Sequence, residues 1–180
     1  TIPGGVVVEY LPQDPPFEAE ATVLEQVFKG DSPLMQLLRA YEMAVEQAAA
    51  EPESTAAQKQ LLALQQQMDD QYAWQLESEA KAVLTQLGIT NLKQKMGELS
   101  GGQRKRVALA GVLVRPSDLL ILDEPTNHMD NATVAWLEQK LLARKGALLM
   151  VTHDRYFFDR VVNRTLEIDG GKGYVYVGNY

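Results

Sequence analysis

Two adjacent acidic residues, Asp123 and Glu124, directly follow the apolar stretch 119–122. This stretch is typical of a buried parallel strand, and ligand sites of α/β proteins form at the carboxyl ends of such strands. One carboxylate there can support a magnesium ion while the next orients a water molecule, as phosphoryl transfer requires. The pair could instead simply end the strand, but Pro125 prevents a simple continuation and favours an ordered loop. The sequence therefore predicts a phosphoryl-transfer site here.

A glycine pair lies where a helix is expected to begin. Ser100 and Gln103 have the spacing of a capping box, so we expect Ser100 to open a helix that runs to Val114. Gly101 and Gly102 leave bare backbone N–H groups at the positive end of the helix macrodipole. A phosphate can bind there, with the Ser100 hydroxyl as a further donor. An ordinary glycine-rich helix start is the alternative.

Two more polar residues follow apolar strands. His153 comes after the predicted buried strand 147–152, and Gln13 comes after the predicted buried strand 6–11. A lone histidine is more often structural than functional, but His153 repeats the arrangement seen at Asp123. Taken alone, Gln13 indicates almost nothing about function. We expect no catalytic role for His128, the other histidine of the chain.

The remaining pattern predicts the elements that position these residues. Ser32 and Pro33 begin a helix that ends before Pro52, and a second helix, capped by Ser54 or Thr55, follows. A third helix stops at Gly88, so 32–88 is predicted to be a helical hairpin with one further helix. Beyond Met96, apolar strands alternate with helices, and the predicted elements are helix 104–114, strand 119–122, helix 134–142, strand 147–152, helix 156–162 and a hairpin of strands 164–169 and 173–177. The fold class is therefore α/β with a mostly parallel sheet.

The composition of the chain excludes several classes of site and of protein. The chain has 180 residues, of which 46% are hydrophobic and 23% charged, as in a soluble globular domain. The net charge of −7 gives no overall attraction to nucleic acid. The absence of cysteine excludes disulfides, thiolate zinc sites and cysteine nucleophiles, and no apolar run is long enough for membrane insertion. The basic residues near Ser100 are expected to form a solvated face with local support for phosphate, and an RNA-binding patch is less favoured; they are Lys93, Lys95, Arg104, Lys105 and Arg106.

Together these motifs resemble the nucleotide-binding domain of ATP-binding cassette (ABC) proteins. The segments 122–130 and 151–157 resemble the ABC-F subfamily, although Met129 replaces the more usual leucine. Members of this subfamily are soluble, carry two such domains in one chain, and often act on ribosomes. The resemblance implies a partial P-loop NTPase domain with an inserted helical subdomain or arm. Its expected parts are 1–17 (strand and Q-loop), 18–98 (helical subdomain with hairpin arm), 99–168 (signature, Walker B and switch-histidine core) and 169–180 (hairpin).

The resemblance also implies catalytic and metal-binding roles. Gln13 would be the Q-loop glutamine, which senses magnesium and the attacking water. Asp123 would support Mg²⁺, and Glu124 would orient and polarise that water. His153 would be the switch histidine on the γ-phosphate of ATP.

Nucleotide-binding roles follow in the same way. Ser100, Gly101, Gly102 and Gln103 would form the signature motif, which contacts ATP held by the opposite domain. Asp130 would be the D-loop aspartate that couples the two sites.

One motif of the family is absent from the sequence. The phosphate-cradling Walker A loop, G-x-x-x-x-G-K-S/T, should precede the Q-loop and hence Thr1. We therefore expect a chain truncated at its amino end that binds ATP weakly or not at all and does not hydrolyse it alone.

The expected partners are a second ABC domain of the same chain and a ribosome, through ribosomal RNA, a ribosomal protein or tRNA. The expected location is cytoplasmic, without membrane insertion. The alternatives are the ATPase subunit of a membrane transporter and an inactive interaction module. The loop 126–128 and the helical insertion favour the ABC-F interpretation.

Overall fold

The computed structural model describes residues 2–178, and the chain divides into two compact units. One unit contains the described residues up to Gln13 and those from Ser117 onwards, and the other spans Asp14–Pro116. The chain therefore passes from one unit to the other after Gln13 and returns after Pro116. The finer division at 17, 98 and 168 given above remains a prediction.

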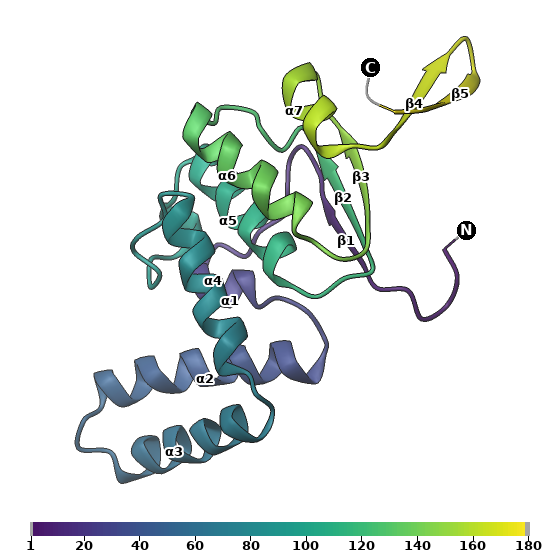
Figure 1. The fold of residues 1–180 in the computed structure, drawn as a ribbon. Coiled ribbons are helices and arrows are strands. Elements are labelled where there is room, and N and C mark those ends of the chain that lie inside the picture. The colour runs from purple at the N-terminus through teal and green to yellow at the C-terminus, as the bar shows by residue number, and fades with distance from the viewer. Residues whose placement is uncertain (1, 179–180) are drawn as a thin grey trace. The chain divides into compact units, whose positions relative to one another are not determined.

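A three-stranded parallel sheet lies in the first unit. Its strands are β1 (Val8–Leu11), β2 (Leu119–Asp123) and β3 (Ala147–Val151), in the spatial order β1-β2-β3. The helix α6 (Asn131–Leu142) connects β2 to β3, and α7 (Arg155–Val161) follows β3 (Figure 1). Parallel strands joined through a helix confirm the predicted α/β class.

The two faces of this sheet differ in burial. Leu11, Leu122 and Met150 lie in one row across the three strands, and all three are buried. On the opposite face, Tyr10 and Leu149 are 53% and 51% exposed. The prediction of fully buried strands is therefore wrong for one face, because apolar composition alone does not specify how many layers cover a strand.

An antiparallel hairpin ends the described chain. It consists of β4 (Arg164–Asp169) and β5 (Lys172–Val177), joined at Gly170 and Gly171. Both glycines have positive φ, 54° and 77°, which suits the tight turn between two strands. The predicted hairpin is confirmed.

The second unit is helical. It contains α1 (Val23–Val27), α2 (Pro33–Ala50), α3 (Thr55–Asp70), α4 (Trp74–Gln86), a short 3₁₀ turn (Met96–Glu98) and α5 (Gly101–Val114). The helices α2 and α3 form the predicted hairpin (Figure 1). Ser32 and Ser54 cap them by accepting hydrogen bonds from Met35 and Ala57 N–H groups. Over residues 2–178, no helix combines the length and apolarity that a membrane span needs.

Two elements of this unit were not predicted, the short helix α1 and the 3₁₀ turn. The five residues of α1 are too few to show a hydrophobic period. Its start is marked instead by a capping box between Thr22 and Glu25. That spacing was present in the sequence and could have located the helix.

Candidate functional site

Three predicted site segments meet one edge of the parallel sheet. Gln13 lies two residues beyond the end of β1, and Glu124 directly follows β2. His153 lies two residues beyond the end of β3. Because the strands are parallel neighbours, their carboxyl ends share an edge, which is where α/β sheets bind ligands (Figure 1). The sequence pattern alone could not show that Gln13 belongs to this edge.

Glu124 and His153 are in direct contact. The His153 backbone N–H donates to Glu124 Oε2 over 3.3 Å, and His153 Nε2 lies 3.4 Å from Glu124 Oε1. The Glu124 side chain is only 11% exposed, whereas that of His153 is 98% exposed. The arrangement therefore sets a largely buried carboxylate beside an imidazole that is open to an incoming group.

The backbone at Glu124 has an uncommon conformation. Its φ of 50° lies in the left-handed region, which residues other than glycine seldom adopt. The Glu124 N–H donates to the Val151 carbonyl over 2.8 Å, which joins the end of β2 to β3. Non-glycine residues held in this region cluster at functional sites because the surroundings must stabilise them. The carboxylate position is thus set by the sheet.

The loop after Glu124 is ordered, as predicted. Pro125 and Thr126 are buried, and the Met129 N–H donates to the Thr126 carbonyl over 3.1 Å. His128 also has a positive φ, 62°, and is exposed. The loop leads directly into the first turn of α6.

Asp130 caps α6. Its carboxylate accepts from the Thr133 N–H over 2.8 Å and from the Thr133 hydroxyl over 3.1 Å. These hydrogen bonds lower the pKa of Asp130, so this exposed residue stays ionised. Asp130 therefore has a structural task in addition to the D-loop role that the resemblance implies.

The signature segment forms the predicted capping box at the start of α5. Ser100 Oγ accepts from the Gln103 N–H over 3.2 Å, and Gln103 Oε1 accepts from the Ser100 N–H over 2.9 Å. Gly101 and Gly102 are exposed, and a Cβ built on either would meet no atom within 4 Å. The start of this helix is therefore open to an anion. It belongs to the helical unit, whereas Glu124 and His153 belong to the other.

The basic residues near Ser100 do not all form a solvated face. Arg104 donates to the carbonyl oxygens of Met96 and Gly97, over 3.2 and 3.1 Å. Lys95 pairs with Glu20 over 2.6 Å. The prediction is wrong for Arg104, because its guanidinium is occupied by backbone acceptors.

The acidic residues fit magnesium only in part. Asp123 and Glu124 offer the carboxylate oxygens that Mg²⁺ prefers. Within the described part of the chain, no group of three or more His, Asp or Glu side chains is arranged to hold a metal ion. Magnesium in nucleotide sites commonly takes one or two carboxylates, with phosphate and water as the other ligands. The residues present therefore suit a metal that arrives with a nucleotide.

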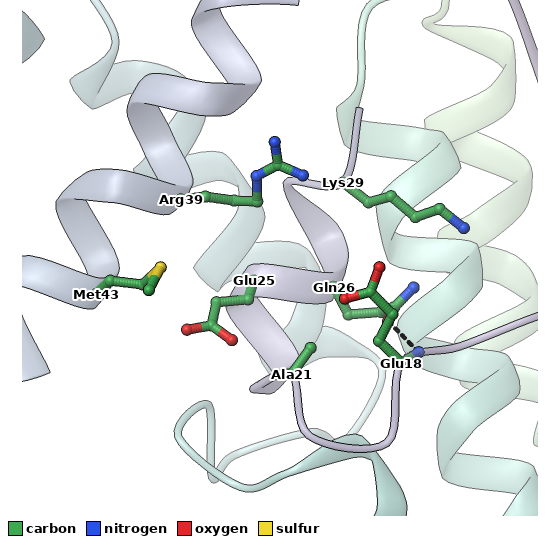
Figure 2. A pocket seen from close by; sticks show the side chains of 7 residues that line it. All are labelled: Glu18, Ala21, Glu25, Gln26, Lys29, Arg39 and Met43. Carbon is green, nitrogen blue, oxygen red and sulfur yellow. Dashed lines mark hydrogen bonds between the residues drawn. The ribbon is translucent and has the colours of Figure 1, made fainter. Parts of the chain in front are cut away.

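Two small pockets contain none of the predicted site residues. A pocket of about 170 Å³ in the helical unit is lined by both acidic and basic side chains (Figure 2). These lining residues are Glu18, Ala21, Glu25, Gln26, Lys29, Arg39 and Met43. A pocket of about 280 Å³ lies beside α7 and β4. Both are below the usual size of small-molecule sites, about 300–1,000 Å³.

The fold and the sheet edge together define a parallel α/β protein with its candidate site at the carboxyl ends of neighbouring strands. A family model described as ABC transporter matches residues 5–127. The chain belongs to this ATP-binding cassette family, and its relatives place it among the ABC-F ATPase domains.

Named relatives match nearly the whole chain. The ABC transporter ATP-binding protein YfmR of Bacillus subtilis is 51% identical over 98% of the chain, which covers 28% of YfmR. The energy-dependent translational throttle protein EttA of Mycobacterium tuberculosis is 39% identical over 98% of the chain, which covers 31% of EttA. The chain therefore spans about three tenths of the length of these curated relatives.

Solved structures are similar in fold. An archaeal ribosome recycling factor, aABCE1, in complex with the ribosomal stalk protein aP1, matches 97% of the chain, which covers 28% of that factor. The TM-score is 0.56 and the identity 25%. An ATP-binding subunit of an ABC transporter matches 94% of the chain, which covers 58% of it, with a TM-score of 0.63 and 17% identity.

Proposed function

We propose that this chain supplies the water-activating and signature parts of an ABC-F type ATPase that acts on the ribosome. The observation that carries the ATPase proposal is the contact between the buried Glu124 carboxylate and His153, beside Asp123 at the sheet edge. A fixed carboxylate can orient the attacking water and an accessible imidazole can contact the phosphate, which are two of the tasks that hydrolysis of a phosphoanhydride sets the protein.

Each residue at the sheet edge has a separate task in this proposal. Glu124 accepts a hydrogen bond from the attacking water and holds it in line with the γ-phosphate. His153, largely exposed beside it, contacts the γ-phosphate oxygens. Gln13, at the same edge of the sheet, would sense the magnesium and the attacking water and so respond to the nucleotide. Asp123 would support the metal. Magnesium bound with ATP supplies charge neutralisation of the phosphates.

The start of α5 serves a second nucleotide. The exposed N–H groups of Gly101 and Gly102 and the Ser100 hydroxyl would contact the γ-phosphate of ATP held by a second ABC domain of the same chain. Gln103 keeps Ser100 in place through the capping box. Asp130 would couple the two nucleotide sites while it caps α6.

The 180-residue chain by itself is proposed to be inactive. Its sequence holds no G-x-x-x-x-G-K-S/T loop to cradle the β- and γ-phosphates. Most of the binding energy for ATP would come from that loop, so Glu124 and His153 alone would retain the nucleotide weakly.

The ribosome is proposed as the partner, through ribosomal RNA, a ribosomal protein or tRNA, in the cytoplasm. The support is the likeness to the translational throttle protein EttA and to the ribosome recycling factor aABCE1. The helical hairpin α2–α3 is the candidate contact arm. The second candidate is an ATPase subunit of a membrane transporter, and the matching family model, which is described as ABC transporter, supports it.

Co-sedimentation separates these candidates. The full-length protein carrying Glu124→Gln, with the matching change in a second ABC domain, should retain ATP without hydrolysing it. We expect it to co-sediment with ribosomes when ATP is present and not when ADP replaces ATP. A folded, ATP-binding protein that stays in the supernatant with both nucleotides would contradict the ribosomal role and leave the ATPase proposal intact.

A further inference from the structure

The segment that follows Gln13 is hydrogen-bonded to the segment that precedes Ser100. The Met96 and Gly97 N–H groups donate to the Ala21 and Ala19 carbonyls, each over 2.9 Å. The Val23 N–H donates to the Gln94 carbonyl over 3.0 Å. We call residues 17–23 and 94–97 the paired segments. They join two stretches of chain that lie far apart in the sequence.

Side chains fasten the same two stretches. Lys95 pairs with Glu20 over 2.6 Å. The Glu18 N–H donates to the buried Gln26 side chain over 3.0 Å, the bond drawn in Figure 2, and this ties the first of the two stretches to α1. A Cβ at Gly97 would lie 3.1 Å from the Ala19 carbonyl oxygen, so the backbones approach more closely than most side chains tolerate.

Arg104 connects the paired segments to the signature helix. Its guanidinium donates to the Met96 and Gly97 carbonyls and lies over the Phe17 ring, with its central carbon 4.3 Å from the ring centroid. Arg104 directly follows the signature residues 100–103 and lies in the first turn and a half of α5. One side chain thus contacts the segment after Gln13, the segment before Ser100 and, through its own backbone, α5.

We propose that Arg104 is a positioning residue that couples the Gln13 loop to the signature motif. This inference rests on the proposed function. A displacement of the chain after Gln13 moves Phe17, and the planar guanidinium passes that movement to Met96, Gly97 and the start of α5. Within one domain, the state of the nucleotide at Gln13 would thereby set the position of Ser100, which serves the other nucleotide.

Arg104→Lys tests this coupling because lysine keeps the charge but loses the planar fork and the stacking surface. In the full-length protein we expect kcat for ATP hydrolysis to fall about tenfold, which corresponds to about 1.4 kcal/mol. The KM for ATP should stay within about twofold, because Arg104 contacts no nucleotide in the proposal. Lys29→Met, which removes an exposed cation from the same helical unit, is the matched control and should leave kcat unchanged.

A double variant distinguishes coupling from a merely structural contribution. Phe17→Leu should lower kcat, and adding Arg104→Lys to it should lower kcat little further, because both changes break the same connection. Additive losses, or equal changes in kcat and KM, would overturn the coupling. So would a normal kcat in Arg104→Lys while hydrogen exchange at Met96 and Gly97 becomes faster. Absence of ATP hydrolysis by the unmodified protein would instead overturn the proposed function itself.

Discussion

Glu42 makes the stability of the helical unit depend on pH. This residue of α2 is only 9% exposed, and one of its carboxyl oxygens has no hydrogen-bond partner. Burial, and then a hydrogen bond with Glu77 of α4, raise the pKa of Glu42 from 4.5 to about 7. Lys81 forms an ion pair with Glu77. The proton on Glu42 therefore helps to hold α2 against α4.

The sign of the effect follows from linkage. A carboxyl whose pKa is higher in the folded chain binds its proton more tightly when folded. Its contribution to the free energy of unfolding is therefore complete below about pH 4.5 and is lost as the pH rises to about 7. At about 1.36 kcal/mol for each pKa unit, the loss is at most about 3 kcal/mol. Partial screening by solvent reduces it to about 1–2 kcal/mol.

Glu42→Gln removes this titration and keeps a donor for Glu77. We expect the variant to be more stable than the unmodified chain at pH 8, by about 1–2 kcal/mol, or about 2–8 °C in Tm. The advantage should shrink towards pH 4.5. Circular dichroism melts at both pH values measure it, and Trp74 fluorescence, with Trp136→Phe, reports on the contact of Trp74 with Tyr41 at 5.1 Å.

Glu53→Gln is the matched control, since it makes the same chemical change at an exposed position of the hairpin. It should leave the pH dependence of Tm unaltered. If Glu42→Gln also leaves that dependence unaltered, the reasoning about a shared proton between α2 and α4 is refuted.

Three further predictions concern the rest of the chain. Gly146→Ala should lower the free energy of unfolding by about 1–3 kcal/mol, because Gly146 has a φ of +102° and a Cβ there would lie 2.8 Å from the Asp118 carbonyl oxygen. Gly4→Ala adds the same methyl group in open space, so denaturant melts of the two variants should differ. Ser100→Ala removes the acceptor of the Gln103 N–H and should cost about 1 kcal/mol in the same assay. The 180-residue chain alone should show no magnesium-dependent phosphate release, and a rate that Glu124→Gln abolishes would refute this.

The sequence predicted the main elements well because their signals are local. The capping box of Ser100, the serine caps of α2 and α3, and the glycine turn between β4 and β5 each depend on a few neighbouring residues. The apolar stretches also identified the parallel strands. Local signals of this kind require no knowledge of distant parts of the chain.

Other features depend on distant contacts and could not be predicted in this way. Arg104 looks like a solvated cation in the sequence, yet it bonds to backbone carbonyls seven and eight residues before it and lies over Phe17. The positive φ of Glu124 depends on pairing with β3. Similarly, the sequence could not show that β1, which ends two residues before Gln13, is the neighbour of β2 in the sheet.

Glu124 is proposed to activate the water that cleaves ATP. The most direct test measures ATP hydrolysis and Mg-ATP binding by two full-length proteins. One is unmodified, and the other carries Glu124→Gln and the matching change in a second ABC domain. We expect kcat to fall by about 100-fold or more while the ATP dissociation constant changes by less than about twofold. His128→Asn is the control, because it changes an exposed residue of the same loop and asparagine tolerates the positive φ at this position. This variant should hydrolyse ATP at the normal rate. Hydrolysis at the normal rate by the Glu124→Gln protein would contradict this role of Glu124.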